Sequence, residues 1–123
     1  MKVSVMRTLP IVISLCLAPL ATTAAQSHAF LDHASPLVGS TVQTAPREVT
    51  LSFTQNLEPA FSTVQVTGPN GGRVDGGRPR VSGNMMRVSI KTAGPGTYHV
   101  HWRALSVDTH TTQGSFAFHV GGQ

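Results

Sequence analysis

The stretch "GTYHVHWRALSVDTHTTQGSFAFHV", from Gly96 to Val120, contains two alternating segments around a polar turn. The first segment is "TYHVHWRA" at 97 to 104, and the second is "GSFAFHV" at 114 to 120. Strict alternation of apolar and polar residues is typical of strands with one buried face. The polar connection from 105 to 113 then predicts that the two strands pair antiparallel.

The two segments also predict a register for this pair. With Ala104 opposite Gly114, one face holds only apolar and aromatic pairs, which are Trp102 with Phe116, Val100 with Phe118 and Tyr98 with Val120. The other face carries His99, His101, Arg103, Ala117 and His119, with His99 opposite His119. A slip by one residue would turn the apolar side chains outward. We therefore expect Trp102 to anchor the core and "SVDTHTTQ" to close the strand pair at one end of the fold.

Three further alternating segments precede this pair, "VTLSF" at 49 to 53, "STVQVTG" at 62 to 68 and "MRVSI" at 86 to 90. Between the segments stand the turn signals "TAPRE", "GPNGGRVDGG", "VSGN" and "TAGPG". The sequence shows no repeat and no long linker. Short strands at regular spacing predict a single antiparallel β-sandwich or Greek-key barrel.

The first 27 residues have the layout of a secretory signal peptide. Basic residues come first, then the apolar run "LPIVISLCLAPLA" at 9 to 21, then the small residues "TTAAQS". The only cysteine, Cys16, lies in that run, so we expect a mature chain without thiol, disulfide or lipid. The run is short for a bilayer span. We predict residues 1–27 as a cleaved signal peptide that directs the chain to secretion, and residues 28–123 as the mature domain.

The mature domain has a modest charge. The whole chain of 123 residues has 40% hydrophobic and 11% charged residues, and from residue 28 on seven basic residues oppose five acidic ones. Three of the arginines lie in the Gly-rich "GGRVDGGRPR", which is typical of a solvated loop. This pattern argues against nucleic-acid binding.

Asp108 and His110 are two residues apart in the turn, and their side chains suit borderline divalent ions such as Cu(II). Alone the pair is a weak signal, because a loop Asp often caps a turn and a nearby His is often only exposed.

His28 is a further candidate ligand for the same ion. Ala25 and Ser27 fit a signal-peptidase site, and cleavage there would let the α-amine and Nδ1 of His28 chelate one ion. Cleavage after Ala25 or Ala29 is also open and would remove that chelate.

The stretch "HAFLDHASPLVGSTVQTAPREVTLSFTQNLEPAFS" and the tail "GTYHVHWRALSVDTHTTQGSFAFHV" resemble the CopC/PcoC-type periplasmic copper-resistance proteins. That family starts its mature chain with His and carries "TAP…V.L.F", "FSE.LE..FS" and "GTY.V.WR..S.D.H...G...F.V". The resemblance implies an all-β, seven-stranded Greek-key sandwich of cupredoxin or immunoglobulin type. It also implies one Cu(II) per chain, held by His28, Asp108 and His110.

Two departures from the family pattern concern the metal. The family's "FSE" is "FTQ" here, so Gln55 replaces an acidic residue near the metal end. Many relatives carry a Met-rich loop for Cu(I), whereas "TGPNGGRVDGGRPRVSGN" holds no methionine. We expect Met85 and Met86 to be edge and core residues of a strand, and the protein to bind Cu(II) only.

The resemblance implies a carrier or buffer in copper homeostasis rather than an enzyme, acting as a monomer with a CopD-like inner-membrane partner. Two other function classes stay open, a copper-dependent oxidase or monooxygenase and a metal-free structural module. We expect His33 to be solvated. We expect His99, His101 and His119 to be exposed strand residues, although three imidazoles so placed could bind adventitious Zn²⁺ or Cu²⁺.

Overall fold

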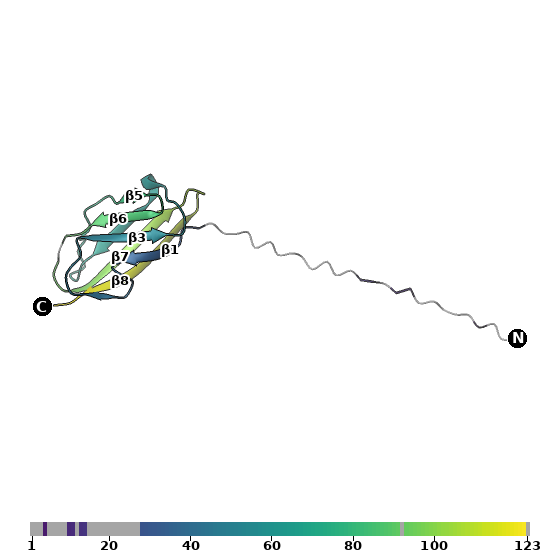
Figure 1. The fold of residues 1–123 in the computed structure, drawn as a ribbon, viewed down its shortest axis with the longest axis horizontal. Coiled ribbons are helices and arrows are strands. Elements are labelled where there is room, and N and C mark those ends of the chain that lie inside the picture. The colour runs from purple at the N-terminus through teal and green to yellow at the C-terminus, as the bar shows by residue number, and fades with distance from the viewer. Residues whose placement is uncertain (1–3, 5–9, 12, 15–27, 92, 123) are drawn as a thin grey trace.

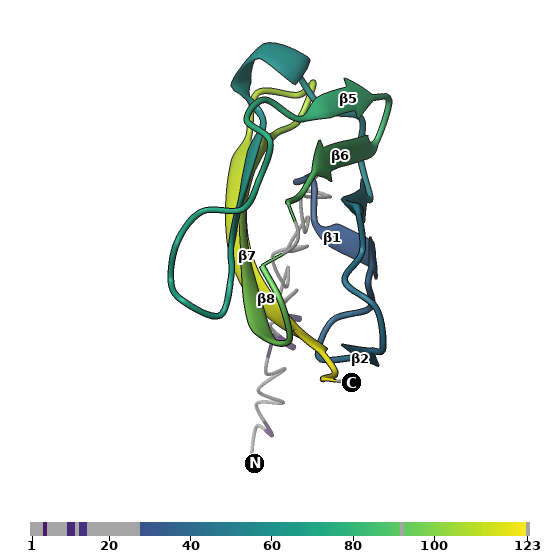
Figure 2. The same cartoon turned by 90° about the vertical axis from the view of Figure 1, so that its left-hand side faces the viewer.

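Two β-sheets face one another across a shared apolar interior (Figure 1; Figure 2). The computed structural model describes residues 4, 10–11, 13–14, 28–91 and 93–122. Most of the predicted signal peptide, including Cys16, lies outside the described residues. The strands of the sandwich lie between residues 31 and 120.

One sheet has the strand order β1-β3-β6-β5, and the other has the order β2-β8-β7-β4. The strands are β1 (Leu31–Ser35), β2 (Thr41–Val42), β3 (Glu48–Phe53), β4 (Thr63–Thr67), β5 (Arg80–Ser82), β6 (Met85–Ser89), β7 (Gly96–Leu105) and β8 (Thr111–Val120). A short 3₁₀ turn, η1 (Pro59–Phe61), precedes β4. The predicted class, an all-β sandwich, is confirmed. The described residues form eight strands rather than seven, and one of these, β2, has only two residues.

The interior forms because alternate residues of each strand point between the sheets. Val49, Leu51 and Phe53 of β3 are buried, and the residues between them are partly exposed. The ring of Phe53 meets the ring of Trp102 edge-on at 5.0 Å, so the two sheets are joined by an aromatic contact. Trp102 is 6% exposed, which confirms it as a core residue.

The predicted faces of β7 and β8 are correct, but the predicted register is wrong by two residues. Trp102 lies opposite Gly114 rather than Phe116, and Val100 lies opposite Phe116. A Cβ at Gly114 would lie 2.6 Å from the Trp102 ring, so the ring occupies space that any other residue would need. A shift of two residues preserves the buried face, and alternation alone therefore cannot exclude it. The missing side chain at position 114 is what selects the register.

The shift is accompanied by a shorter turn, because both strands extend beyond the predicted segments. β8 begins at Thr111, so the connection covers 106–110 rather than 105–113. It also separates the outer histidines, because His99 pairs with Ala117 and His119 pairs with Thr97. The predicted pairing of His99 with His119 is therefore wrong.

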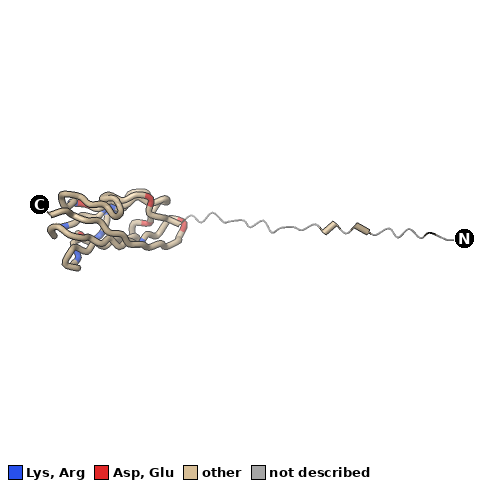
Figure 3. The backbone as a smooth tube through the Cα atoms, turned by 90° about the horizontal axis from the view of Figure 1, so that it is seen from below, with Lys and Arg blue, Asp and Glu red and all other residues tan. Residues whose placement is uncertain are grey.

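Two ion pairs join arginines to carboxylates among the described residues. Along the backbone, the charged residues are separated by long uncharged stretches (Figure 3). Arg80 contacts Glu48 at 2.6 Å, and Arg73 contacts Asp75 at 2.7 Å. The Asp75 side chain is 1% exposed and also accepts a hydrogen bond from the Val66 N–H at 3.0 Å. Burial raises the pKa of Asp75, but the hydrogen bonds from Arg73 and Val66 and the Arg73 charge together bring it below its ordinary value.

Candidate metal centre

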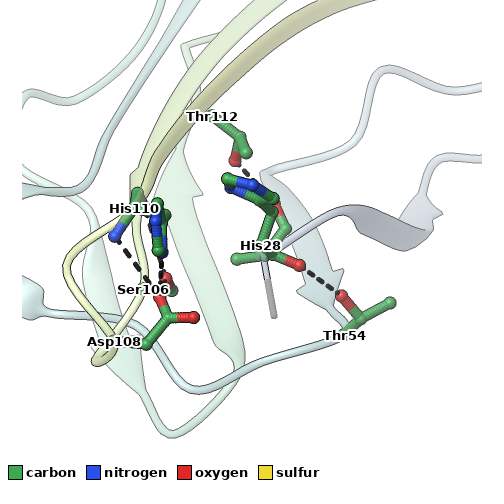
Figure 4. Close-up of polar contacts among 7 residues, drawn as sticks. His28, Thr54, Ser106, Asp108, His110 and Thr112 are labelled. Carbon is green, nitrogen blue, oxygen red and sulfur yellow. Dashed lines mark hydrogen bonds and ion pairs between the residues drawn. The ribbon is translucent and has the colours of Figure 1, made fainter. Parts of the chain in front are cut away.

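The segment that carries His28 is fixed at one end of the sandwich by two threonines. The Thr54 hydroxyl donates to the His28 carbonyl at 3.2 Å and accepts from the Phe30 N–H at 3.0 Å. From the other sheet, the Thr112 hydroxyl donates to the Ala29 carbonyl at 2.5 Å. The segment is thus held between the end of β3 and the start of β8, which places His28 beside the β7–β8 turn (Figure 4).

His28 and His110 lie together across the more than eighty residues that separate them in sequence. Their ring centroids are 4.5 Å apart with an interplanar angle of 67°, and Figure 4 shows the two rings side by side. The Nδ1 atom of His28 is buried and has no hydrogen-bond partner among the described residues. Buried polar atoms are usually hydrogen-bonded, so an unpartnered nitrogen here points to a ligand.

The turn that carries the other two predicted ligands is tight. The Ser106 N–H donates to the His110 carbonyl at 3.0 Å, and the Thr109 N–H donates to the Ser106 carbonyl at 2.9 Å. Thr109 has a φ of 75°, in the left-handed region that a residue other than Gly rarely adopts. Such a residue persists where its surroundings hold it, and these conformations are concentrated at functional sites.

Asp108 lies against His110. Its Oδ1 atom accepts hydrogen bonds from the Ser106 hydroxyl and, at 3.3 Å, from the His110 N–H. The same oxygen is 3.4 Å from Nδ1 of the His110 ring. The structure thus joins His28 to His110 and His110 to Asp108. Within the part of the chain that the structure describes, no group of three or more His, Cys, Asp or Glu side chains is arranged to hold a metal ion.

Three residues at this site were not singled out in the sequence. Ser106 contacts Asp108 and His110, while Thr54 and Thr112 fix the segment of His28. Ser106 belongs to the "S.D.H" motif of the resembled family, which is the one signal that could have singled it out. The two threonines could be assigned only from the fold.

Residues 54–57, which follow β3, lie close to His28 and to the β7–β8 turn. The Val107 N–H donates to the Asn56 carbonyl at 3.0 Å, and Leu57 forms an isolated bridge with Ser106. Gln55 lies in this segment and is partly buried. The position that is acidic in the family pattern therefore lies at the end of the sandwich that carries His28, Asp108 and His110.

The remaining histidines are exposed. His33 lies on β1 opposite Ser52, and its exposure agrees with the expectation. On the outer face of the other sheet, His101 contacts the Ser115 hydroxyl at 2.8 Å and His119 contacts the Thr97 hydroxyl at 3.0 Å. Each of these two rings thus has a neighbouring hydroxyl as its partner.

The two adjacent methionines divide as expected. Met86 is fully buried, whereas Met85 is only partly buried on the other side of β6. None of the described residues forms a helix with the length and hydrophobicity needed to cross a bilayer.

Fold and site together define a small β-sandwich domain with a pair of histidines and a carboxylate at one end. The CopC domain family matches residues 31–121, and the chain belongs to this family. It is similar to Protein YobA of Escherichia coli strain K12, at 31% identity over 95% of this chain and 98% of the relative.

The fold is shared with solved structures of the same family. The crystal structure of CopC from Methylosinus trichosporium OB3b matches with a TM-score of 0.72 and 28% identity, over 78% of this chain and 96% of that one. PcoC from Escherichia coli, described as a methionine-rich copper resistance protein, matches with a TM-score of 0.67 and 31% identity, over 77% of this chain and 100% of that one. The two-sheet architecture is therefore that of the CopC proteins.

Proposed function

We propose that this protein binds copper in the periplasm as Cu(II), with one ion per chain, through His28, Asp108 and His110. Membership of the CopC family and the copper resistance function named for its relative PcoC support copper as the metal. The observation that carries the proposal is the buried Nδ1 of His28, which has no partner among the described residues and lies beside the ring of His110.

The donor set matches the chemistry of Cu(II). After cleavage before His28, the α-amine and Nδ1 would supply two nitrogens, His110 a third nitrogen and Asp108 an oxygen. Nitrogen-rich tetragonal sites favour Cu(II) over the other divalent ions of its row. Asp108 would bind the ion through its second oxygen, Oδ2, while Oδ1 keeps its contacts with the Ser106 hydroxyl and, at 3.4 Å, with Nδ1 of the His110 ring.

The ion is cargo in this proposal. The protein is a monomeric carrier or buffer that sequesters copper, rather than an enzyme, and its delivery partner is a CopD-like inner-membrane protein. No thiol is present after residue 27 and the stretch 67–84 has no methionine, so reduction to Cu(I) should weaken binding.

The test is a competition titration of the mature protein, residues 28–123, with Cu(II), Zn(II) and Ni(II). We expect one Cu(II) per chain and an electron paramagnetic resonance spectrum of mixed nitrogen and oxygen ligation. His110→Ala should weaken Cu(II) binding by at least about 100-fold, which is about 2.7 kcal/mol. His99→Ala is the matched control, because His99 is an exposed strand histidine away from this site, and it should leave the affinity unchanged.

Each of the other outcomes identifies a different function. Loss of copper to a modest competing chelator would favour a metal-free structural module. Substrate oxidation at an enzyme-like rate by the copper-loaded protein would favour an oxidase or monooxygenase. Tight copper retention after reduction by ascorbate would contradict a site selective for Cu(II).

A further inference from the structure

Ser106 is a polar residue buried where β7 enters the turn. It is 0% exposed, and together with Ser62 it is one of two buried polar residues among those that the structure describes. Burying a hydroxyl is unfavourable unless it is hydrogen-bonded. The contacts that this hydroxyl makes therefore account for its place in the fold.

Those contacts run to both predicted ligands of the turn (Figure 4). The Ser106 hydroxyl donates to Oδ1 of Asp108, and its oxygen lies 3.2 Å from the His110 carbonyl. A hydroxyl has a single proton to donate. The carboxylate is the stronger acceptor because it is charged, so the proton goes to Asp108.

The orientation of the carboxylate in turn affects the His110 ring. The oxygen that accepts from Ser106 also faces Nδ1 of His110 at 3.4 Å. A histidine that directs an Nδ1 proton at a carboxylate keeps the lone pair on Nε2, where a metal ion can bind. A serine that fixes the carboxylate therefore also sets which ring nitrogen is available.

We infer that Ser106 is a positioning residue of the metal site, acting on copper through Asp108 and His110 without binding it. The inference rests on the proposed function. The turn lies at the surface, where the side chain of His110 is 57% exposed and that of Asp108 is 28% exposed. A contact from a buried residue is what can restrict the orientation of these two side chains. Ser106 is such a residue, and its backbone also pairs with His110 and Thr109.

The experiment compares Ser106→Ala with Ser62→Ala in the mature protein. Ser62 is also a buried serine near this end of β7, 3% exposed, and its hydroxyl accepts from the Leu105 N–H at 3.2 Å. Both substitutions remove one buried hydroxyl of the β7 region, but only Ser106 contacts the turn's carboxylate. Ser106→Thr, which keeps the hydroxyl donor and adds no copper-binding thiol, is the second variant in case Ser106→Ala does not fold.

We expect Ser106→Ala to bind Cu(II) about 10- to 100-fold more weakly than the wild type, which is the usual effect of losing an outer hydrogen bond at a metal site. Its electron paramagnetic resonance hyperfine coupling should also shift, a change that a loss of stability alone would not cause. Ser106→Thr, which keeps the hydroxyl, should stay closer to the wild type than Ser106→Ala does in both copper measurements. Ser62→Ala should lower the unfolding temperature without changing either copper measurement.

The outcomes separate this inference from the proposed function. A wild type that binds copper, with Ser106→Ala equal to it in affinity and spectrum, would overturn the role of Ser106 alone. Equal losses in Ser106→Ala and Ser62→Ala would show that only stability had changed, and would also overturn it. A wild type that fails to retain copper would overturn both.

Discussion

His28 is the residue whose surroundings give the strongest indication of a metal site. One ring nitrogen is buried without a partner, while the ring itself contacts the rings of Phe30 and His110 at 6.0 and 4.5 Å. An unsatisfied buried polar atom costs about 1–3 kcal/mol. The fold therefore bears a cost at His28 that a bound metal ion would remove.

A single residue added before His28 tests the predicted chelate. Insertion of Ala between Ser27 and His28, in a form cut directly before the insertion, would replace the α-amine of His28 with an amide. An amide nitrogen is a poor donor until it loses its proton, so we expect Cu(II) binding to weaken by at least about 100-fold, or about 2.7 kcal/mol. Competition titration of both forms measures the difference.

The matched control is one Ala added after Gln123, which lengthens the chain equally but at its other end. It should bind copper as the wild type does. The intact mass of the secreted protein gives the natural terminus. Equal affinity with and without the N-terminal Ala, or a mature terminus other than His28, would rule out the chelate.

At the scale of the elements, the β7–β8 pair shows what the sequence could and could not predict. Alternation predicted correctly which side chains of both strands are buried, because side-chain direction repeats every two residues. It could not predict the pairing, because registers that differ by two residues bury the same face. The structure shows that the packing of Trp102 over Gly114 distinguishes them.

The candidate metal site likewise contains residues that the sequence predicted and residues that only the fold reveals. Asp108 and His110 were recognisable because they are two residues apart in a polar turn, and His28 because it follows a predicted cleavage site. Thr54 lies 26 residues from His28 in sequence, and Thr112 lies 83 residues from Ala29. Hydrogen bonds between such distant groups depend on how the sheets pack, and no local pattern encodes them.

Gly114→Ala tests the register. The added Cβ would lie 2.6 Å from Cζ2 of Trp102, so the ring or the strand must move. Overpacking of this kind costs about 1–3 kcal/mol, and we expect the variant to lose that much free energy of unfolding and to change its Trp102 fluorescence. Denaturant titration followed by fluorescence measures both effects.

Gly72→Ala is the control for this substitution. Gly72 has open space around its Cα and no positive φ, so an added methyl should be neutral or slightly stabilising. If Gly114→Ala proved as stable as Gly72→Ala, Trp102 would not pack over position 114, and the predicted pairing of Trp102 with Phe116 would regain support.

At the scale of the whole molecule, stability depends on the packed interior, because the chain after residue 27 has no cysteine for a disulfide. The carboxylate of Asp75 is a charged group that also contributes to the stability of the folded state. The side chain of Asp75 is 1% exposed and accepts hydrogen bonds from Arg73 and Val66, and the residue lies in the connection that leads from β4 to β5. Its contribution should depend on pH, because its pKa is below the ordinary value in the folded state.

Asp75→Asn should therefore destabilise the protein in a pH-dependent manner. Because the folded-state pKa of Asp75 is lowered, its stabilising contribution is present above the unfolded pKa of about 3.9 and is lost as the pH falls through the lower folded value. We expect the variant to lose about 1–3 kcal/mol of unfolding free energy at neutral pH, and the difference in unfolding free energy from the wild type to narrow below about pH 4.

Asp32→Asn, a change at an exposed carboxylate, is the control and should show little effect at any pH. Urea titrations between pH 2.5 and 7 measure the difference, and a gap that stays constant over this range would show that Asp75 stabilises the fold by packing rather than by its charge.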